Sequence, residues 1–387
     1  MTPILSSRRQ FLVASAALPF ALRSFAQAPT EPRWIFLGTG VQGIYRAPWN
    51  AATGELGAIE LAVATDRPSF IAMHPRLPLL YAANEAAKGD GAFSSFHVDA
   101  TQGTLKLIQQ VSSRGGAPCY VSIDSTGRSA FVADYMGGSM AAFALGPAGE
   151  ITDAGGLDCQ HNPACGVLGP VKDRQEQPHL HCATISPGND FLLVCDLGDD
   201  AIEVFPIAPG KKDLVGAPVR VQARVGSGPR HVVFHPNKRW VYCVHELDCT
   251  IDLYDWHAHG RKATLTLREG STISTLTAGS AMAGNTGCEV LVSEDGRFIY
   301  TCTRGEDTIS VYRVDATTGL LTEQQRFSCG GKIPRIIAFD PSHKWLVSCN
   351  QGGDGSVTVF AHEPKTGHLS ETPKTFAAPN PMFAQWV

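Results

Sequence analysis

The chain has 387 residues, of which 18% are charged, and a formal net charge of −4, as in an ordinary globular protein. It contains no basic run or polybasic patch, which argues against nucleic acid or an anionic membrane surface as a partner. The 39 Gly and 25 Pro recur at regular intervals, and helical apolar periodicity is hard to find after residue 30. We therefore predict an all-β fold of many short strands joined by turns.

Residues 1–28 are predicted to be an export signal and not part of the fold. Arg8 and Arg9 precede Phe11 and a short apolar stretch, and 26–28 (Ala-Gln-Ala) offer a small-x-small cleavage site. This order resembles the twin-arginine export signal, and the apolar stretch is too short to span a bilayer. We therefore expect a mature domain of residues 29–387 in the periplasm, with no membrane attachment after signal cleavage.

One sequence repeat recurs along the mature chain: an apolar strand, a turn, a second apolar strand, a polar pair and a third strand. Six complete copies begin at Pro68, Pro118, Pro178, Pro229, Gly287 and Pro334. Residues 381–387 match only the first strand of the repeat, and residues 34–39 match the second. Joining the two ends completes a seventh copy and removes two free sheet edges. The sequence therefore predicts a seven-bladed β-propeller whose first blade is closed by the C-terminal strand.

Most of the 11 cysteines are predicted to be small buried core residues and not disulfides. They fall at a position of the repeat where other copies have alanine. That position holds Ala83, Ala133, Cys195, Cys302 and Cys349. Cys159 and Cys165 differ because they flank a Pro-containing loop, and for this pair a disulfide and two free thiols are equal alternatives. One His and two Cys without a fourth ligand are a weak zinc signal.

Ionisable side chains gather at one end of the predicted blades. If the first strand is innermost, its start and the end of the antiparallel second strand share one face. The residues at the start of first strands are His179, His181, Arg230, His231, Glu289 and Arg335. Those just after second strands are Asn84, Glu85, Asp134, Asp196, His245, Glu246, Arg304, Asn350 and Gln351. Because burying charge without a function is costly, we expect the functional site at this mouth of the central channel.

In this order, one blade apart, the motifs resemble the seven-bladed propeller lactonases, a family that includes bacterial 6-phosphogluconolactonase and the fungal carboxy-muconate lactonising enzyme. The resemblance covers essentially the whole mature chain. Its most specific pieces are 177–181 (Gln-Pro-His-Leu-His), 228–236, 246–247, 304–312, 334–335 and 350–351. It implies a lactone hydrolase with a His, an Arg, a Glu and a second Arg in the channel mouth. These fall on His179 or His181, Arg230, Glu246 and Arg304.

The other residues at the mouth are expected to bind the substrate: His231, Glu289, Arg335, Asn84, Glu85, Asn350 and Gln351. The chain departs from the family pattern beside the implied catalytic positions. His245 and Thr303 replace asparagines that are usual there, Cys288 replaces an alanine, and Ile336 stands where a histidine is usual. These departures concern the identity of the substrate more than the type of reaction.

Lactone hydrolysis needs a base that deprotonates water and a group that stabilises the oxyanion. A neutral His or an ionised Glu can take the proton, and arginine suits both the oxyanion and an anionic substrate group. Arg230 and Glu246 can alternatively be a structural ion pair. His179 and His181 can be paired metal ligands, a substrate clamp or core histidines. We expect no metal and no cofactor, because the chain has neither a motif that demands a metal nor a glycine-rich phosphate loop.

The expected partner is a small-molecule lactone, bound by a monomer. Two other functions stay open: reversible lactonisation of a dicarboxylic muconate, and a non-catalytic periplasmic scaffold that binds other molecules. A pentose-phosphate lactone is a cytoplasmic compound. If the enzyme is exported, aldonolactones and aromatic-derived lactones are alternative substrates.

The export hypothesis is tested at the arginine pair. Changing both Arg8 and Arg9 to Lys keeps the charge but removes the recognised pair, so we expect precursor to accumulate in the cytoplasm. Cell fractionation and immunoblotting measure this directly. Periplasmic accumulation equal to that of the wild type would contradict a twin-arginine signal.

Overall fold

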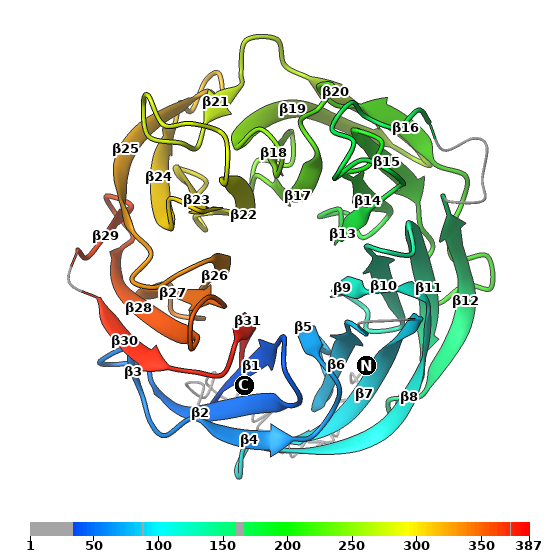
Figure 1. The fold of residues 1–387 in the computed structure, drawn as a ribbon. Coiled ribbons are helices and arrows are strands. Elements are labelled where there is room, and N and C mark those ends of the chain that lie inside the picture. Colours follow the sequence, from blue (N-terminus) through cyan, green and yellow to red (C-terminus); the bar gives the residue numbers. More distant parts are fainter. Residues whose placement is uncertain (1–33, 87–88, 160–165, 372) are drawn as a thin grey trace, which may run out of the picture. The chain divides into compact units, whose positions relative to one another are not determined.

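The computed structural model describes residues 34–86, 89–159, 166–371 and 373–387, and every helix or strand element within them is a β-strand. The strands form seven antiparallel sheets placed as blades around a central axis (Figure 1). The predicted all-β, seven-bladed propeller is therefore confirmed. Among these residues there is no helix with the length and apolarity to cross a membrane. The predicted signal peptide lies outside the described residues.

The first three blades run from the start of the described chain to the long connection before residue 180. Blade 1 contains β1 (Trp34–Thr39), β2 (Ile44–Asn50), β3 (Glu55–Leu56), β4 (Glu60–Val63) and β31 (Pro381–Trp386). Blade 2 contains β5 (Pro68–Met73), β6 (Leu79–Asn84), β7 (Asp90–Asp99) and β8 (Thr104–Gly116). Blade 3 contains β9 (Pro118–Ile123), β10 (Ser129–Asp134), β11 (Ser139–Leu145) and β12 (Ile151–Asp158).

The remaining four blades repeat the same order of strands from the axis outward. Blade 4 contains β13 (Leu180–Ile185), β14 (Phe191–Asp196), β15 (Ala201–Pro206) and β16 (Val219–Gln222). Blade 5 contains β17 (Pro229–Phe234), β18 (Trp240–His245), β19 (Thr250–His259), β20 (Lys262–Leu267) and β21 (Ile273–Ser274). Blade 6 contains β22 (Thr286–Val292), β23 (Phe298–Arg304), β24 (Thr308–Val314) and β25 (Leu321–Ser328). Blade 7 contains β26 (Pro334–Phe339), β27 (Trp345–Asn350), β28 (Ser356–Glu363), β29 (His368–Leu369) and β30 (Lys374–Ala377).

Each blade is apolar on both faces because it packs between two others. In β6, Leu79, Tyr81 and Ala83 pack against blade 3, while Leu80 and Ala82 point the opposite way and pack against blade 1. A hydrophobic cluster of this kind fills each of the seven interfaces between neighbouring blades. The strict alternation of strand side chains thus produces near-continuous apolar runs in the second strands.

The two ends of the described chain meet in blade 1. β31 pairs antiparallel with β1, in a register that places Trp386 opposite Ile35 and Ala384 opposite Leu37. The backbone groups of Trp34 and Val387 exchange two further hydrogen bonds, of 3.1 and 3.0 Å. The C-terminal strand therefore supplies the innermost strand of the first blade, as predicted, and leaves no gap in the ring.

The strand pairing places the predicted site residues at one mouth of the channel. In every blade the first residue or residues of the innermost strand pair with the end of the second strand, for example Pro229 with His245 and Pro334 with Asn350. The longest connection between blades, residues 159–179, joins β12 to β13. It is an insertion into the repeat.

The cysteine prediction also agrees with the structure. Cys195, Cys302 and Cys349 are free and fully buried in the second strands, at the position that Ala83 and Ala133 occupy in blades 2 and 3. Cys159 is buried and disulfide-bonded. Cys165, the other member of the pair for which a disulfide and two free thiols were equal alternatives, lies outside the described residues.

Deleting residues 382–387 tests the closure of the ring. Met382 and Trp386 are buried, and burial of two such side chains is worth about 3–6 kcal/mol. Their removal also exposes the edge of β1 with which β31 pairs. We expect insoluble protein or a large fall in melting temperature by calorimetry. Deletion of Val387 alone is the control and should have a much smaller effect. A six-residue truncation that melts with the wild type would disprove closure by β31.

Candidate active site

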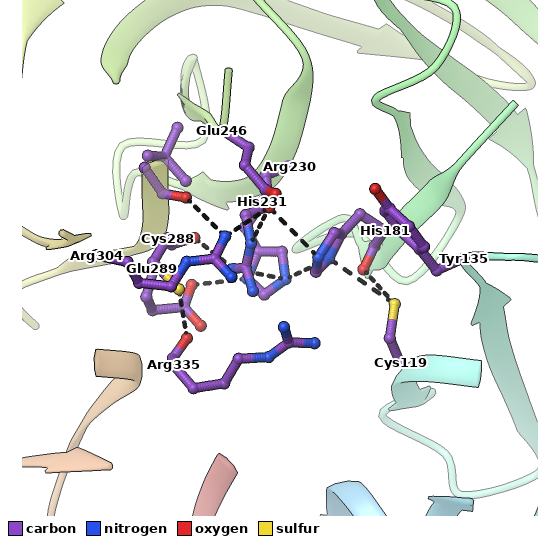
Figure 2. Close-up of polar contacts among 12 residues, drawn as sticks. Cys119, Tyr135, His181, Arg230, His231, Glu246, Cys288, Glu289, Arg304 and Arg335 are labelled. Atoms are coloured by element: carbon purple, nitrogen blue, oxygen red, sulfur yellow. Dashed lines mark hydrogen bonds and ion pairs between the residues drawn. The ribbon is translucent and has the colours of Figure 1, made fainter. Parts of the chain in front are cut away.

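A bulge near the start of each innermost strand supplies the site. In all seven blades the pairing of the first and second strands shifts register close to the mouth. The residues left without a cross-strand partner are Ser69, Cys119, His181, Arg230, Cys288 with Glu289, Arg335 and Met382. A bulge re-aims side chains locally. Because of the bulge, Arg230 and His231, which are consecutive in sequence, both reach one cluster of polar side chains at the mouth. The cluster also contains His181, Glu246, Glu289, Arg304 and Arg335 (Figure 2).

Glu246 is the centre of this cluster (Figure 2). Its Oε2 atom accepts from Arg230 Nε at 3.0 Å and lies 2.8 Å from Arg304 Nη2. Its Oε1 atom accepts from Arg174 Nη2. Burial alone would raise the pKa of the Glu246 carboxyl, but the Arg304, Arg230 and Arg174 guanidiniums together hold it well below its usual range. Glu246 is therefore ionised at neutral pH and a poor proton acceptor.

A chain of hydrogen bonds links Glu289 to His231 and His181. His231 Nδ1 lies 2.9 Å from Glu289 Oε1, and His231 Nε2 lies 3.3 Å from Arg230 Nη1 and 3.2 Å from His181 Nδ1. Arginine is only a donor, so His231 Nε2 must be an acceptor. His231 Nδ1 therefore carries the proton and donates a hydrogen bond to Glu289. His181 Nδ1 then donates to His231, which leaves the lone pair of a neutral His181 on Nε2. These contacts therefore determine both tautomers.

Both histidines of this chain are neutral at physiological pH. Burial lowers the pKa of His181 well below its usual value, and the positive charge of Arg230 adds to the effect. Burial also lowers the pKa of His231, although Glu289 opposes the shift. His181 Nε2 lies 3.8 Å from Glu246 Oε2. A lone pair thus faces a carboxylate, and a donor such as water or a substrate hydroxyl can bond to both.

Arg335 is the guanidinium of the cluster without a carboxylate. In the described part of the chain its side chain makes no hydrogen bond or ion pair, although its charge is close enough to lower the pKa of both His181 and His231. Its backbone carbonyl accepts from Cys288 Sγ at 2.7 Å, which fixes the strand and leaves the side chain free. Figure 2 shows the guanidinium beside the two imidazoles. It is available to an anion.

His179 lies beside the cluster and not within it. Its ring stacks on Tyr135 with centroids 4.3 Å apart, its Nδ1 lies 2.9 Å from the Tyr135 carbonyl, and its Nε2 lies 3.1 Å from Glu176 Oε1. Both ring nitrogens therefore face protein oxygens, and neither is directed at the cluster. Of the two histidines predicted as alternatives, the geometry favours His181 as the reactive one.

Four residues predicted to bind the substrate lie outside the cluster. Asn84 bonds to Ser94 and to the connection before blade 2, and Asn350 bonds within its own strand and to strand β28 of blade 7. Glu85 pairs with Arg67 at 3.9 Å, and Gln351 holds the backbone of 333 and the side chain of 380 through its main chain. A role in substrate binding stays a prediction for all four.

Three residues of the cluster were missed from the sequence. Cys119 Sγ lies 3.8 Å from His181 Nδ1, and the Tyr135 ring contacts His181 edge-on with centroids 5.5 Å apart. Arg174 reaches Glu246 from the insertion before blade 4. Cys119 and Tyr135 stand at the repeat positions of Arg230 and Glu246, so the repeat offered a signal for both, whereas Arg174 lies outside the repeat, three residues before the motif at 177–181. Across residues 34–86, 89–159, 166–371 and 373–387, no group of three or more His, Cys, Asp or Glu is placed to hold a metal ion.

A family model for the seven-bladed β-propeller lactonases matches residues 35–386 of this sequence. The chain belongs to this family. It is 27% identical to the 6-phosphogluconolactonase of Bacillus subtilis over 348 residues, which are 90% of this chain and 95% of that protein. It is 28% identical to the 6-phosphogluconolactonase of Formosa agariphila over 349 residues, 86% and 92% of the two chains.

Among solved structures, the fold is similar to that of a periplasmic gluconolactonase from Pseudomonas aeruginosa. The TM-score is 0.82 at 26% identity, over 92% of this chain and 98% of the other. The four positions that the family resemblance implied as catalytic, with His181 as the histidine, are adjacent in this lactonase fold: Arg230, Arg304 and His181 all surround the Glu246 carboxylate.

Glu246→Gln tests the role of the carboxylate. The variant leaves Arg230, which is fully buried, without its charge partner, so the free energy of unfolding should fall by about 3–5 kcal/mol at pH 7. The pKa of Glu246 is lowered by folding, so its contribution is complete above the unfolded value of about 4.3 and is lost as pH falls through the lower folded value. Denaturant unfolding at pH 7 and at lower pH should show the difference shrink.

Glu176→Gln is the matched control, because this carboxylate is half-exposed and its partner is the buried His179 and not an arginine, so the variant should change stability by less than about 1 kcal/mol. If Glu246→Gln unfolds like the wild type at pH 7, Glu246 is not the anchor of the guanidinium cluster.

Proposed function

We propose that this lactonase-family protein hydrolyses a lactone that carries an anionic group, with His181 as the general base. The observation that carries the proposal is the charge balance of the cluster. Arg174, Arg230, Arg304 and Arg335 face only two carboxylates, Glu246 and Glu289. With both histidines neutral, the cluster has two positive charges in excess. Such an excess in a largely buried site favours an anionic ligand.

The proton chemistry follows from the tautomers. His181 presents its Nε2 lone pair, so it can take a proton from a water molecule as that water attacks the lactone carbonyl. The ring C–O bond then breaks, and the proton returns from His181 to the leaving alkoxide oxygen. Glu289 and His231 hold His181 in the tautomer that the step needs. Glu246 is a less suitable base, because the guanidiniums keep its pKa low.

The guanidiniums supply the electrostatic part of the reaction. Negative charge develops on the carbonyl oxygen as water attacks, and preorganised donors at that position lower the barrier. Arg230 and Arg304 are held rigidly by Glu246, whereas Arg335 has its donors free. We assign the oxyanion to this group of arginines, and we assign to Arg335 either the oxyanion or the anionic substituent. The product is a hydroxy acid, whose new carboxylate the same residues can bind.

Relatives support this assignment, and they set the choice of substrates. Two curated relatives are named 6-phosphogluconolactonases, and a structural neighbour is named a periplasmic gluconolactonase. We therefore propose sugar lactones as the first substrates to test. The name of the neighbour also agrees with the proposal that residues 1–28 direct this chain to the periplasm.

Hydrolysis of glucono-δ-lactone, 6-phosphoglucono-δ-lactone and glucarolactone by the mature protein, with and without chelator, tests the function. We expect turnover above the uncatalysed rate. The pKa of His181 lies well below its usual value, so kcat/KM should be flat through neutral pH and should fall only at pH values well below the usual range of a histidine, where His181 becomes protonated. A rate that falls instead as pH rises through neutrality would contradict a neutral histidine base.

Two variants isolate the base. His181→Asn keeps a donor toward His231 but removes the Nε2 lone pair, so kcat should fall by about 10²–10⁴. His179→Asn should cost much less. The reverse order would assign the base to His179. Absence of turnover with all lactones, together with interconversion of a muconate and its lactone, would favour the lactonising reaction.

A further inference from the structure

The insertion before blade 4 contributes to the site a side chain that no strand supplies. Its described part, residues 166–178, is held at the mouth by hydrogen bonds to the turns of blades 3 and 4. Gly169 N donates to the Gly198 carbonyl at 2.9 Å, and the Gln175 side chain donates to the Leu197 carbonyl at 2.8 Å. The Gln177 side chain donates to the Met136 carbonyl at 3.0 Å. These bonds position Arg174 over the cluster.

Arg174 differs from the other guanidiniums on Glu246 in its exposure. Its side chain is 36% exposed, against 1% for Arg230 and 15% for Arg304. It uses one nitrogen only, because Nη2 donates both to Glu246 and to the Tyr135 hydroxyl. Within the described residues, Nε and Nη1 have no partner. Arg174 therefore stands between the buried cluster and solvent with several donors unused.

The two oxygens of Glu246 are used unequally. Oε2 is shared by Arg230 and Arg304, with His181 nearby, whereas among the described residues Oε1 is bonded by Arg174 alone. Arg230 and Arg304 are fixed by strands β17 and β23. Arg174 can exchange its carboxylate for another anion without moving a strand, and the two strand arginines still neutralise Glu246.

We propose that Arg174 is a specificity-determining residue that binds the anionic substituent of the substrate at the entrance of the site. It is matched to a planar two-oxygen edge of a phosphate or a carboxylate, because a guanidinium with free donors binds such groups bidentately. This inference rests on the proposed lactonase function and extends it. It separates recognition of the substituent, by the insertion, from the reaction at His181.

The test compares charged and neutral substrates in three variants. Arg174→Ala should lower the preference for 6-phosphoglucono-δ-lactone over glucono-δ-lactone, measured as the ratio of kcat/KM, by about tenfold or more, the usual range for a charged hydrogen bond. Arg174→Lys should recover part of the ratio. Lys172→Ala is the matched control, because it removes one exposed charge from the same segment and should leave the ratio unchanged. Glucarolactone as a third substrate distinguishes a carboxylate from a phosphate.

A binding measurement keeps this inference separate from the proposed reaction. By calorimetry, the wild type should bind 6-phosphogluconate or glucarate more tightly than gluconate, and Arg174→Ala should lose that preference whether or not any lactone is turned over. If Arg174→Ala weakens gluconate as much as the ligands that carry a second anionic group, Arg174 is only a brace for Glu246 and the proposal is overturned. If the wild type opens no lactone but the binding preference depends on Arg174, the reaction fails and the anion site stands.

Discussion

The pairing of β31 with β1 is the constraint on which the rest of the structure depends. A single blade is apolar on both faces, so no blade is stable until it lies between two others. With seven blades joined in a ring, every face is covered and every interface holds its own hydrophobic cluster. The same closure fixes the distance of the innermost strands from the axis. Side chains that start those strands, on blades far apart in sequence, are thereby brought within hydrogen-bond distance.

The bulge in each innermost strand converts this ring into a site. A regular strand would alternate its side chains, and Arg230 and His231 would point to opposite sides. The bulge removes that alternation at the mouth, so both side chains join the cluster with His181 and Glu246. The chain uses the seven bulges unequally. Blades 4 to 7 place His, Arg, Cys-Glu and Arg there, whereas blades 1 to 3 place Met, Ser and Cys, which puts the reactive groups on one side of the channel.

The repeat made the fold predictable, because apolar strands at a fixed spacing leave few architectures, and the split copy at the two ends indicated closure. The mouth was also predictable, because antiparallel pairing brings the start of one strand to the end of the next. The choice between His179 and His181 was not, since it depends on a bulge that has no sequence signature. Arg174 was missed for a different reason: it lies in an insertion outside the repeat, where strand periodicity says nothing about side-chain direction.

The cluster divides the chemistry among residues that look equivalent in the sequence. Two carboxylates are present, but three guanidiniums hold Glu246 ionised while Glu289 orients a histidine. His181 and His231 are in contact, but the Arg230 donor forces His231 Nε2 to act as an acceptor. His181 Nδ1 must then donate to it, which leaves the free lone pair on His181 Nε2. Four arginines are present, but two are locked by strands and two keep free donors. The proposed reactive and anion-binding groups are therefore distinguished by their partners and not by their residue type.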